Sequence, residues 1–288
     1  MESTVFLDGE YLPSDQARIS VEDRGFLFGD AVYEVSPAYR GTFFRLDRHL
    51  DRMRRGLGAL QIDWDVAELP GIHEGLLARN GLDAAEVSIV YLQVTRGVAP
   101  RTHHFPPGPV RPTVFGYAKE FLRPARERWE EGWAAITVPD QRWARADLKT
   151  TCLLPNVLAQ EAARRSDVAD AVLVRDGFAL EGAHNNLFAV FGDTVVTHPA
   201  SNQILHGITR EFVLELARGA GMPVEERPIP LEELSGADEI FFTGTTTEIR
   251  PTVELDGLPV GEGRVGPVAR ALFDAFLAGV EQARRGQG

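Results

Sequence analysis

Cysteine and lysine are scarce in this chain. Its 288 residues include one cysteine, Cys152, so no disulfide can form within the chain, which fits a reducing compartment. Lysine stands only at Lys119 and Lys149, and nearly all of the 30 basic side chains are arginines. The net charge of −12 argues against a protein that binds nucleic acid or anionic membranes, because both attract clustered cationic side chains.

Long apolar runs and targeting signals are also missing. No stretch approaches the length of a membrane span. The start, "MESTVFLDGEYLPS", has no cationic segment followed by an apolar core, so we expect a cytoplasmic protein. The glycine-rich signatures of nucleotide sites, the Walker motif and G-x-G-x-x-G, do not occur.

What is present indicates a globular protein of two domains. Hydrophobic residues make up 44% and charged residues 25%, and the length allows two domains with large cores. Helical and strand-like patterns are mixed in both halves, which favours two α+β domains over a doubly wound parallel sheet. We expect an N-terminal domain over 1–119, an interdomain linker over the polar segment 120–132, and a C-terminal domain over 133–288.

Local patterns predict the individual elements. Apolar residues at alternating steps of four and three from Leu46 to Leu60 form one face of a helix. Further helices are expected to end at Asn80-Gly81 and to cover 153–166, 208–218 and 266–285. Asp-Gly or Gly-Asp pairs predict hairpins, and β-branched runs predict strands. The hairpins are expected about residues 8–9, 176–177 and 192–193, and the other strands over 86–95, 111–119, 133–140 and from 238.

Two short stretches could bind a phosphate. Gly207 precedes a helix that opens with Ile208 and Thr209, and a helix N-terminus offers free N–H groups and partial positive charge. Thr245 stands in a second hydroxyl-rich loop, 244–247. Taken alone, these features are more often those of a helix cap and a strand-end turn than of a phosphate site.

Lys149 and Glu181 are candidates for chemistry. A buried lysine can lose its proton and form a Schiff base. If the cofactor is pyridoxal 5′-phosphate (PLP), its ring nitrogen needs a carboxylate partner that keeps it protonated, so that the ring acts as an electron sink. Without further context, a surface lysine and a turn glutamate remain the simpler interpretation.

Six segments taken together carry a family resemblance. They are "EDRGFLFGDAVYEV" (22–35), "VTRGVAPRTHHFP" (94–106), "LKTTCLLPNVLA" (148–159), "ALEGAHNNLF" (179–188), "HPASNQILHGITRE" (198–211) and "FFTGTTTEIRP" (241–251). The chain resembles the fold-type IV (class IV) PLP-dependent aminotransferases over nearly its whole length, and most closely the bacterial D-amino acid aminotransferases. The resemblance implies a homodimer of two-domain α+β subunits, with PLP between the domains.

The resemblance also implies roles for individual residues. Lys149 matches the Schiff-base lysine, and Glu181 matches the partner of the ring nitrogen. Tyr33 matches an active-site tyrosine, and Leu205 matches the residue packed against the ring. The phosphate-binding positions are matched by Arg52, Ile208, Thr209 and Thr245. No metal is implied.

The loop "GVAPRTHHFPPG" (97–108) matches the substrate-binding loop of this subfamily. There an Arg-x-His pair from the partner subunit reaches the α-carboxylate of the substrate, and Arg101 and His103 match it. Residues two apart in an extended segment share a face, and the prolines at 100 and 106 limit the entropy lost when the loop is ordered. Without the resemblance, the loop is typical of a solvated surface turn.

These matches predict transamination between D-amino acids and 2-oxo acids, for example D-alanine and 2-oxoglutarate giving pyruvate and D-glutamate. Lys149 would move the α-proton as general base and then acid. The main alternative is an (R)-selective amine transaminase or a mixed activity. An aminodeoxychorismate lyase is disfavoured because "KTTCLLPN" replaces a Lys-x-x-Asn-Arg motif, and a branched-chain L-aminotransferase lacks the Arg-x-His loop. A non-catalytic PLP-binding protein remains the non-enzyme alternative.

Several positions depart from the subfamily pattern. Ala183, His184, Asn185 and Asn186 replace a run of serines, Ala31 replaces a commoner glycine, and Ser36-Pro37 replaces a bulkier pair. These differences leave the preferred substrate side chain open.

Overall fold

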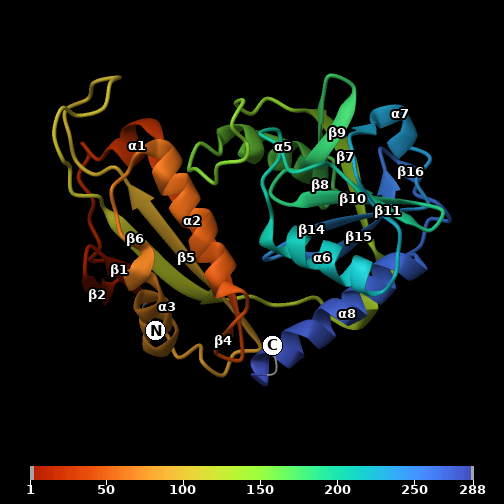
Figure 1. Cartoon of the computed structure of the whole chain (residues 1–288), viewed down its shortest axis with the longest axis horizontal. Helices are drawn as coiled ribbons and strands as arrows, with labels where there is room; N and C mark the ends of the chain where they lie inside the picture. The colour runs from red at the N-terminus through yellow and green to blue at the C-terminus, as the bar shows by residue number, and fades with distance from the viewer. Residues whose placement is uncertain (1–2, 287–288) are drawn as a thin grey trace. The chain divides into compact units, whose positions relative to one another are not determined.

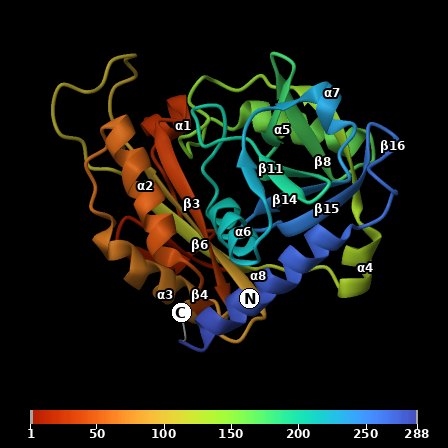
Figure 2. The same ribbon diagram turned by 45° about the vertical axis from the view of Figure 1, so that its right-hand side comes forward.

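The computed structural model describes residues 3–286, which divide into two compact units. The first runs through Arg123 and takes in the segment Leu148–Cys152. The second contains Pro124–Asp147 and the chain from Leu153 onward. Each unit combines one sheet with helices (Figures 1 and 2). The segment 120–132, expected to be a linker, contains the end of a strand of the first unit and a short helix of the second.

The first unit has an antiparallel sheet of six strands in the order β2-β1-β6-β5-β3-β4. Its strands are β1 (Thr4–Leu7), β2 (Glu10–Pro13), β3 (Ala31–Tyr39), β4 (Thr42–Phe43), β5 (Val87–Thr95) and β6 (Val114–Glu120). Asp8 and Gly9 both have positive φ, 49° and 104°, as the tight turn between β1 and β2 requires. The predicted hairpin is therefore confirmed.

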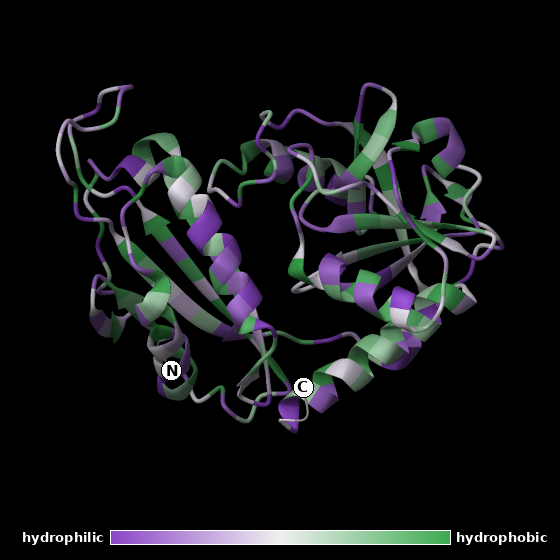
Figure 3. Ribbon diagram, viewed as in Figure 1, coloured by the Kyte–Doolittle hydropathy of each residue, from purple (hydrophilic) through white to green (hydrophobic). Residues whose placement is uncertain are grey.

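Helices α1 (Arg24–Phe28), α2 (Leu46–Leu60) and α3 (Leu69–Arg79) belong to the same unit. Met53 and Leu57 of α2 join Leu76 of α3 and Val90 and Leu92 of β5 in one buried cluster. The other side of α2 is hydrophilic (Figure 3), as its apolar stripe predicts. Because strand residues alternate between faces, Tyr91 lies on the opposite face of the sheet from this core.

The second unit has a sheet of ten strands in the order β12-β11-β10-β14-β15-β7-β8-β9-β13, with β16 paired to β15. They are β7 (Trp133–Pro139), β8 (Asp170–Arg175), β9 (Phe178–Gly182), β10 (Asn186–Phe191), β11 (Thr194–Thr197), β12 (Val224–Glu226), β13 (Ile229–Pro230), β14 (Glu239–Gly244), β15 (Glu248–Leu255) and β16 (Leu258–Pro259). One additional pair, Asn186 with Glu181, joins β10 to β9 and closes six of these strands into a ring.

Helices α4 (Arg126–Glu131), α5 (Leu154–Arg165), α6 (Ile208–Gly219), α7 (Leu231–Leu234) and α8 (Pro267–Arg284) complete the second unit. The predicted helices over 153–166, 208–218 and 266–285 are confirmed, as are the hairpins about 176–177 and 192–193. Across residues 3–286, no helix has the length and apolar character needed to cross a membrane.

Strand β3 was missed by the sequence analysis. It holds Glu34 and Pro37, which break the expected alternation of a strand, yet it pairs with β5 along its full length. Glu34 is tolerated at a buried position because Arg52 of α2 pairs with it. Tertiary contacts thus override a weak local strand signal at this position.

Candidate active site

Lys149 lies against Tyr33 in the first unit. The Tyr33 backbone N–H donates a 3.0 Å hydrogen bond to the Lys149 carbonyl, and Thr150 forms a bridge with Val32. These backbone contacts hold the half-buried lysine beside β3, where its Nζ lies 3.3 Å from the Tyr33 hydroxyl. Among the ion pairs found within residues 3–286, none involves Lys149. The structure therefore brings together two residues that the sequence singled out separately.

The ring of Tyr33 is held by a stack of tyrosines. Tyr33 stacks on Tyr91 with ring centroids 5.4 Å apart, and Tyr91 stacks on Tyr117 at 5.0 Å. The three residues come from β3, β5 and β6, which are neighbours in the sheet. Burial raises the pKa of the Tyr91 hydroxyl, which donates a hydrogen bond to Gln93. The stack restricts the position of the Tyr33 ring, and with it the hydroxyl that Lys149 reaches.

Arg52 is buried on α2, where its guanidinium pairs with Glu34. Nε and Nη2 donate to the two carboxylate oxygens at 2.9 and 2.6 Å, the bidentate geometry that arginine favours. Burial alone would raise the pKa of Glu34, but Arg52 and the nearby His49 hold it well below its usual range. The pair fixes the direction of the Arg52 side chain.

Arg101 and His103 share one aromatic neighbour, Phe28. The Arg101 guanidinium lies 5.1 Å from the centre of the Phe28 ring, and the His103 ring centroid lies 5.8 Å from it. Both side chains are exposed. They thus lie on one side of the loop, in agreement with their spacing of two residues.

The sequence analysis missed the residues that anchor this loop. Arg24 donates to the Thr102 carbonyl at 2.8 Å and pairs with Asp30 at 2.9 Å. Arg96 pairs with the same carboxylate at 2.7 Å and lies 3.7 Å from the centre of the Phe105 ring. The three charged side chains are about nine-tenths buried or more, and they stand inside the segments 22–35 and 94–106 that carried the resemblance. The position of these charged residues inside the segments that carried the resemblance is the signal that could have identified them.

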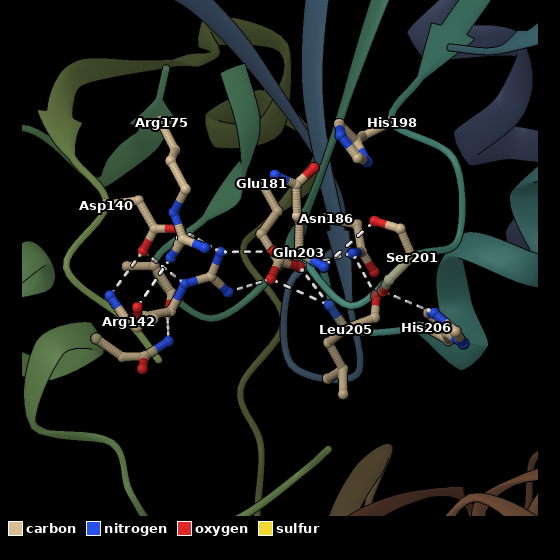
Figure 4. Close-up of polar contacts among 12 residues, drawn as sticks. Asp140, Arg142, Arg175, Glu181, Asn186, His198, Ser201, Gln203, Leu205 and His206 are labelled. Carbon is tan, nitrogen blue, oxygen red and sulfur yellow. Dashed lines mark hydrogen bonds and ion pairs between the residues drawn. The ribbon is translucent and has the colours of Figure 1, made fainter. Parts of the chain in front are cut away.

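Glu181 is the centre of a polar cluster in the second unit (Figure 4). It is 3% exposed near the end of β9, and it accepts hydrogen bonds from the Leu205 backbone N–H at 3.1 and 3.2 Å and from Asn186 at 2.8 Å. Arg142 forms an ion pair with it. Burial raises the pKa of Glu181 to about 7, although Arg142 acts in the opposite direction.

The start of α6 adjoins this cluster through Asn186. Gly207 is the N-cap of the helix, whose first residues Ile208 and Thr209 are buried, and among residues 3–286 no side chain caps it. A Cβ placed on Gly207 would lie only 2.0 Å from Asn186 Oδ1, so this position needs glycine for space. Asn186 also donates to the Leu205 carbonyl at 2.8 Å. One amide side chain therefore contacts Glu181, the Leu205 loop and the approach to α6.

Thr245 lies in the turn between β14 and β15, where it is half-buried. Helix α6 packs against β14, the strand that leads into this turn. His184 is exposed, whereas its neighbours Asn185 and Asn186 are buried. Asn186, which stands at a position where the subfamily has a serine, is thus one of the hydrogen-bond donors to Glu181.

Comparison with known proteins identifies the family. Residues 31–255 match the family described as amino-transferase class IV. This match spans more than half of the chain, and the chain belongs to the class IV aminotransferases, a family of PLP-dependent enzymes.

The chain is similar over nearly its full length to curated D-alanine aminotransferases. That of Staphylococcus haemolyticus is 39% identical over 279 residues, which are 96% of this chain and 98% of the relative. The Staphylococcus aureus (strain MSSA476) protein is 36% identical with the same coverage. The Bacillus licheniformis protein is 36% identical over 94% of this chain and 95% of its own length.

Solved structures of the family share the fold. The branched-chain amino acid aminotransferase of Escherichia coli has a TM-score of 0.89 at 26% identity, covering 96% of this chain and 94% of that one. The branched-chain aminotransferase of Thermoproteus uzoniensis with norvaline has a TM-score of 0.85 at 27% identity, covering 97% and 95%. Another branched-chain enzyme, solved with pyridoxamine 5′-phosphate, has a TM-score of 0.87 at 26% identity, covering 97% and 94%. The expected α+β fold of type IV is confirmed.

Proposed function

We propose that the chain is a PLP-dependent D-amino acid:2-oxo acid aminotransferase. The similarity to D-alanine aminotransferases at 36–39% identity supports the choice of substrate class. The observation that carries it is the loop in which Arg101 and His103 gather on Phe28. The fold neighbours named as branched-chain enzymes are 26–27% identical, which makes them the weaker guide to substrate.

The residues of the second unit fit a phosphorylated pyridine. The uncapped first turn of α6 offers backbone N–H groups, and the Thr209 hydroxyl adds a donor for the phosphate. Glu181 offers a buried carboxylate to the ring nitrogen, and Leu205, next to it, is assigned to pack on the ring. We assign Ile208 and Thr245 to the phosphate as well, on the strength of the family motif.

The first unit would supply the amine. Lys149 carries the amino group, and among the ion pairs of residues 3–286 none holds it to a carboxylate. Arg52, held by Glu34, is assigned to the cofactor phosphate. Tyr33 contacts the Lys149 amine and would limit its orientations.

The bound cofactor would supply an electron sink for the pair of electrons left on the substrate α-carbon. Lys149 Nζ takes the α-proton as general base and returns it as general acid, and the nearby Tyr33 hydroxyl orients that nitrogen. Glu181 holds a proton on the ring nitrogen by accepting its hydrogen bond.

Arg101 and His103 would bind the α-carboxylate of the substrate. A guanidinium on a stiff loop makes charge-assisted hydrogen bonds to a carboxylate, and an imidazole adds a second donor. In keeping with the family, we assign this loop to the active site of the partner subunit in a homodimer. Sedimentation of the holoenzyme as a single protomer would contradict that assignment.

An (R)-selective amine transaminase, or a mixed activity, is the second candidate. The observation that favours it is the set of departures from the subfamily at 183–186 and at Ser36-Pro37. Such an enzyme needs no group for a carboxylate, so the presence of Arg101 argues against strict amine specificity.

A substrate panel tests the assignment. The holoenzyme is mixed with D- and L-alanine, D- and L-leucine and (R)-1-phenylethylamine, each with 2-oxoglutarate as acceptor, and the chirality of the glutamate product is determined. We expect D-alanine to react and to yield D-glutamate. Faster reaction of L-leucine would replace the proposal by a branched-chain L-aminotransferase, and reaction of the amine alone would replace it by an amine transaminase.

A further inference from the structure

Arg142 is held by three partners at once (Figure 4). It follows β7, and its side chain is 7% exposed. Nε and Nη2 donate to the carboxylate of Asp140 at 2.9 and 3.0 Å, and Nη2 also donates to the Gln203 carbonyl at 3.0 Å. Nη1 donates to Oε1 of Glu181. The fork of the guanidinium therefore spans two carboxylates and a backbone oxygen and has little freedom to turn.

A second arginine, Arg175, also holds Asp140. Its carboxylate is fully buried, and Arg175 Nη2 lies 2.8 Å from it. Arg175 also donates to the Arg142 carbonyl at 2.9 Å. Cations and carboxylates thus alternate in the order Arg175, Asp140, Arg142, Glu181.

The other contacts of Glu181 are uncharged. The Leu205 N–H and the Asn186 amide donate to it, while Asp140, the nearby anion, repels its negative charge. Within residues 3–286, Arg142 is the cation that pairs with Glu181. Burial and Asp140 both favour the neutral acid, so Arg142 opposes both.

The protonation state of Glu181 decides what it can do. An ionised carboxylate accepts the hydrogen bond of a protonated ring nitrogen, whereas a protonated carboxyl has a donor of its own and competes for that position. With Arg142 present, the pKa of Glu181 is raised to about 7, so the balance is close at neutral pH. A modest loss of positive charge beside Glu181 would therefore make the protonated carboxyl its dominant form.

We propose that Arg142 is a positioning residue that keeps Glu181 ionised and aims its carboxylate at the cofactor nitrogen. This inference rests on the proposed function, because it takes PLP as the ligand. It adds a residue that touches neither the substrate nor the assigned cofactor atoms and acts only through Glu181.

Infrared spectroscopy of the holoenzyme as a function of pH tests the charge directly. The band of a protonated Glu181 carboxyl is assigned by its loss in Glu181→Gln. We expect the band to vanish at a lower pH in the wild type than in Arg142→Gln, where it should persist about one to three pH units higher, the usual effect of removing an adjacent opposite charge. An unchanged titration in Arg142→Gln overturns the proposal.

Two further variants separate charge from structure. Arg142→Lys keeps the charge and should restore a titration close to that of the wild type. Arg175→Gln removes a cation of the same network that does not contact Glu181, and it should move the titration less than Arg142→Gln does. If Arg142→Gln does not fold, the titration of Glu181 in Arg142→Lys and in the wild type still tests the proposal. A Glu181 that stays protonated in alkaline solution in either one contradicts the proposal.

The pH profile of kcat provides the functional readout. Because activity requires ionised Glu181, the acid limb should move to higher pH in Arg142→Gln. At a pH below both acid limbs, kcat should be about ten- to thousandfold lower than in the wild type, one decade per pH unit of the shift. A fall in kcat of equal size at every pH would indicate a merely structural role and would also overturn the proposal. If D-amino acids do not react at all, the proposed function fails, while the infrared titration still tests the Arg142–Glu181 pair.

Discussion

The amine of Lys149 lies 3.3 Å from the Tyr33 hydroxyl and 4.3 Å from the centre of its ring. The two residues are 116 positions apart in the sequence. The chain has one other lysine, Lys119, which is exposed on β6 and provides a matched control.

Lys149→Ala should abolish multiple turnover, because Lys149 is the residue assigned to take the α-proton, while Lys119→Ala should keep wild-type activity. The rates with D-alanine and 2-oxoglutarate measure this. Borohydride reduction followed by peptide mass spectrometry should locate a covalent pyridoxyl label on Lys149 in the wild type. A label on Lys119, or full activity in Lys149→Ala, would show that the assignment is wrong.

Glu181→Gln should lower kcat strongly while PLP stays bound, because a neutral amide does not hold a proton on the ring nitrogen. Glu239 is a suitable control, since its buried carboxylate accepts the Val268 and Ala269 N–H groups at 2.8 and 2.7 Å at the start of α8. Glu239→Gln should lower the free energy of unfolding by about 0.5–2 kcal/mol, as for a lost helix cap, and leave kcat unchanged in folded protein. Equal kcat values in the two variants would remove Glu181 from the chemistry.

Arg101→Ala should lower kcat/KM for D-alanine about ten- to a hundredfold or more, because a hydrogen bond to a charged group contributes roughly 1.5–3 kcal/mol. His103→Ala should have a smaller effect, since a neutral imidazole brings no charge. (R)-1-phenylethylamine has no carboxylate, so any reaction with it should be little affected.

The same loop region supplies controls for this prediction. Arg111 and His104 are exposed, and Arg111→Ala and His104→Ala should leave both substrates unaffected. An Arg101→Ala effect of the same size on D-alanine and on the amine would remove the loop from carboxylate binding.

Gly207→Ala should weaken PLP binding, because the new Cβ would meet Asn186 Oδ1 at 2.0 Å and disturb the amide that contacts Glu181 and Leu205. Gly219→Ala, at the other end of α6, meets no atom of the described residues within 4 Å and serves as the control. Titration of PLP into each protein measures the dissociation constant. Indistinguishable constants for the two variants would contradict this role of the α6 start.

His73 should make the first unit less stable in acid. Its ring donates to the Leu69 carbonyl at 2.7 Å and accepts from Ser36 at 3.0 Å, and burial lowers its pKa to about 4 from 6.5. Between these values the unfolded chain binds the proton and the folded chain does not. The stability is therefore complete above about pH 6.5 and falls as the pH drops, by about 3 kcal/mol at pH 4.

Urea unfolding at a series of pH values, with hydrogen exchange reporting on α3, measures this loss. His73→Gln should flatten the profile in that window, and an unchanged slope would contradict the prediction. His49, whose pKa is also lowered, chiefly by burial, leaves a residual slope in both proteins.

The elements that the sequence predicted best are those whose conformation depends on residues close together in the chain. The turn at Asp8-Gly9 requires two positive φ angles that this pair adopts readily, and the apolar stripe of α2 requires only helical periodicity. The scarcity of lysine and the motif around Lys149 likewise needed no structure to be noticed. These features are local, so a short window of sequence contains the information.

The surroundings of the candidate site depend on residues far apart in the chain. Asp30 lies 66 residues from Arg96, and Arg142 lies 39 residues from Glu181, so no local pattern predicts either pair. Whether a charged side chain is buried, paired and ionised depends on desolvation and on the charges around it, and both are properties of the folded chain. The order of residues was therefore enough to indicate the family and to single out the reactive lysine and its carboxylate partner as candidates. The arginine proposed to keep that carboxylate charged could be found only once folding had brought the two side chains together.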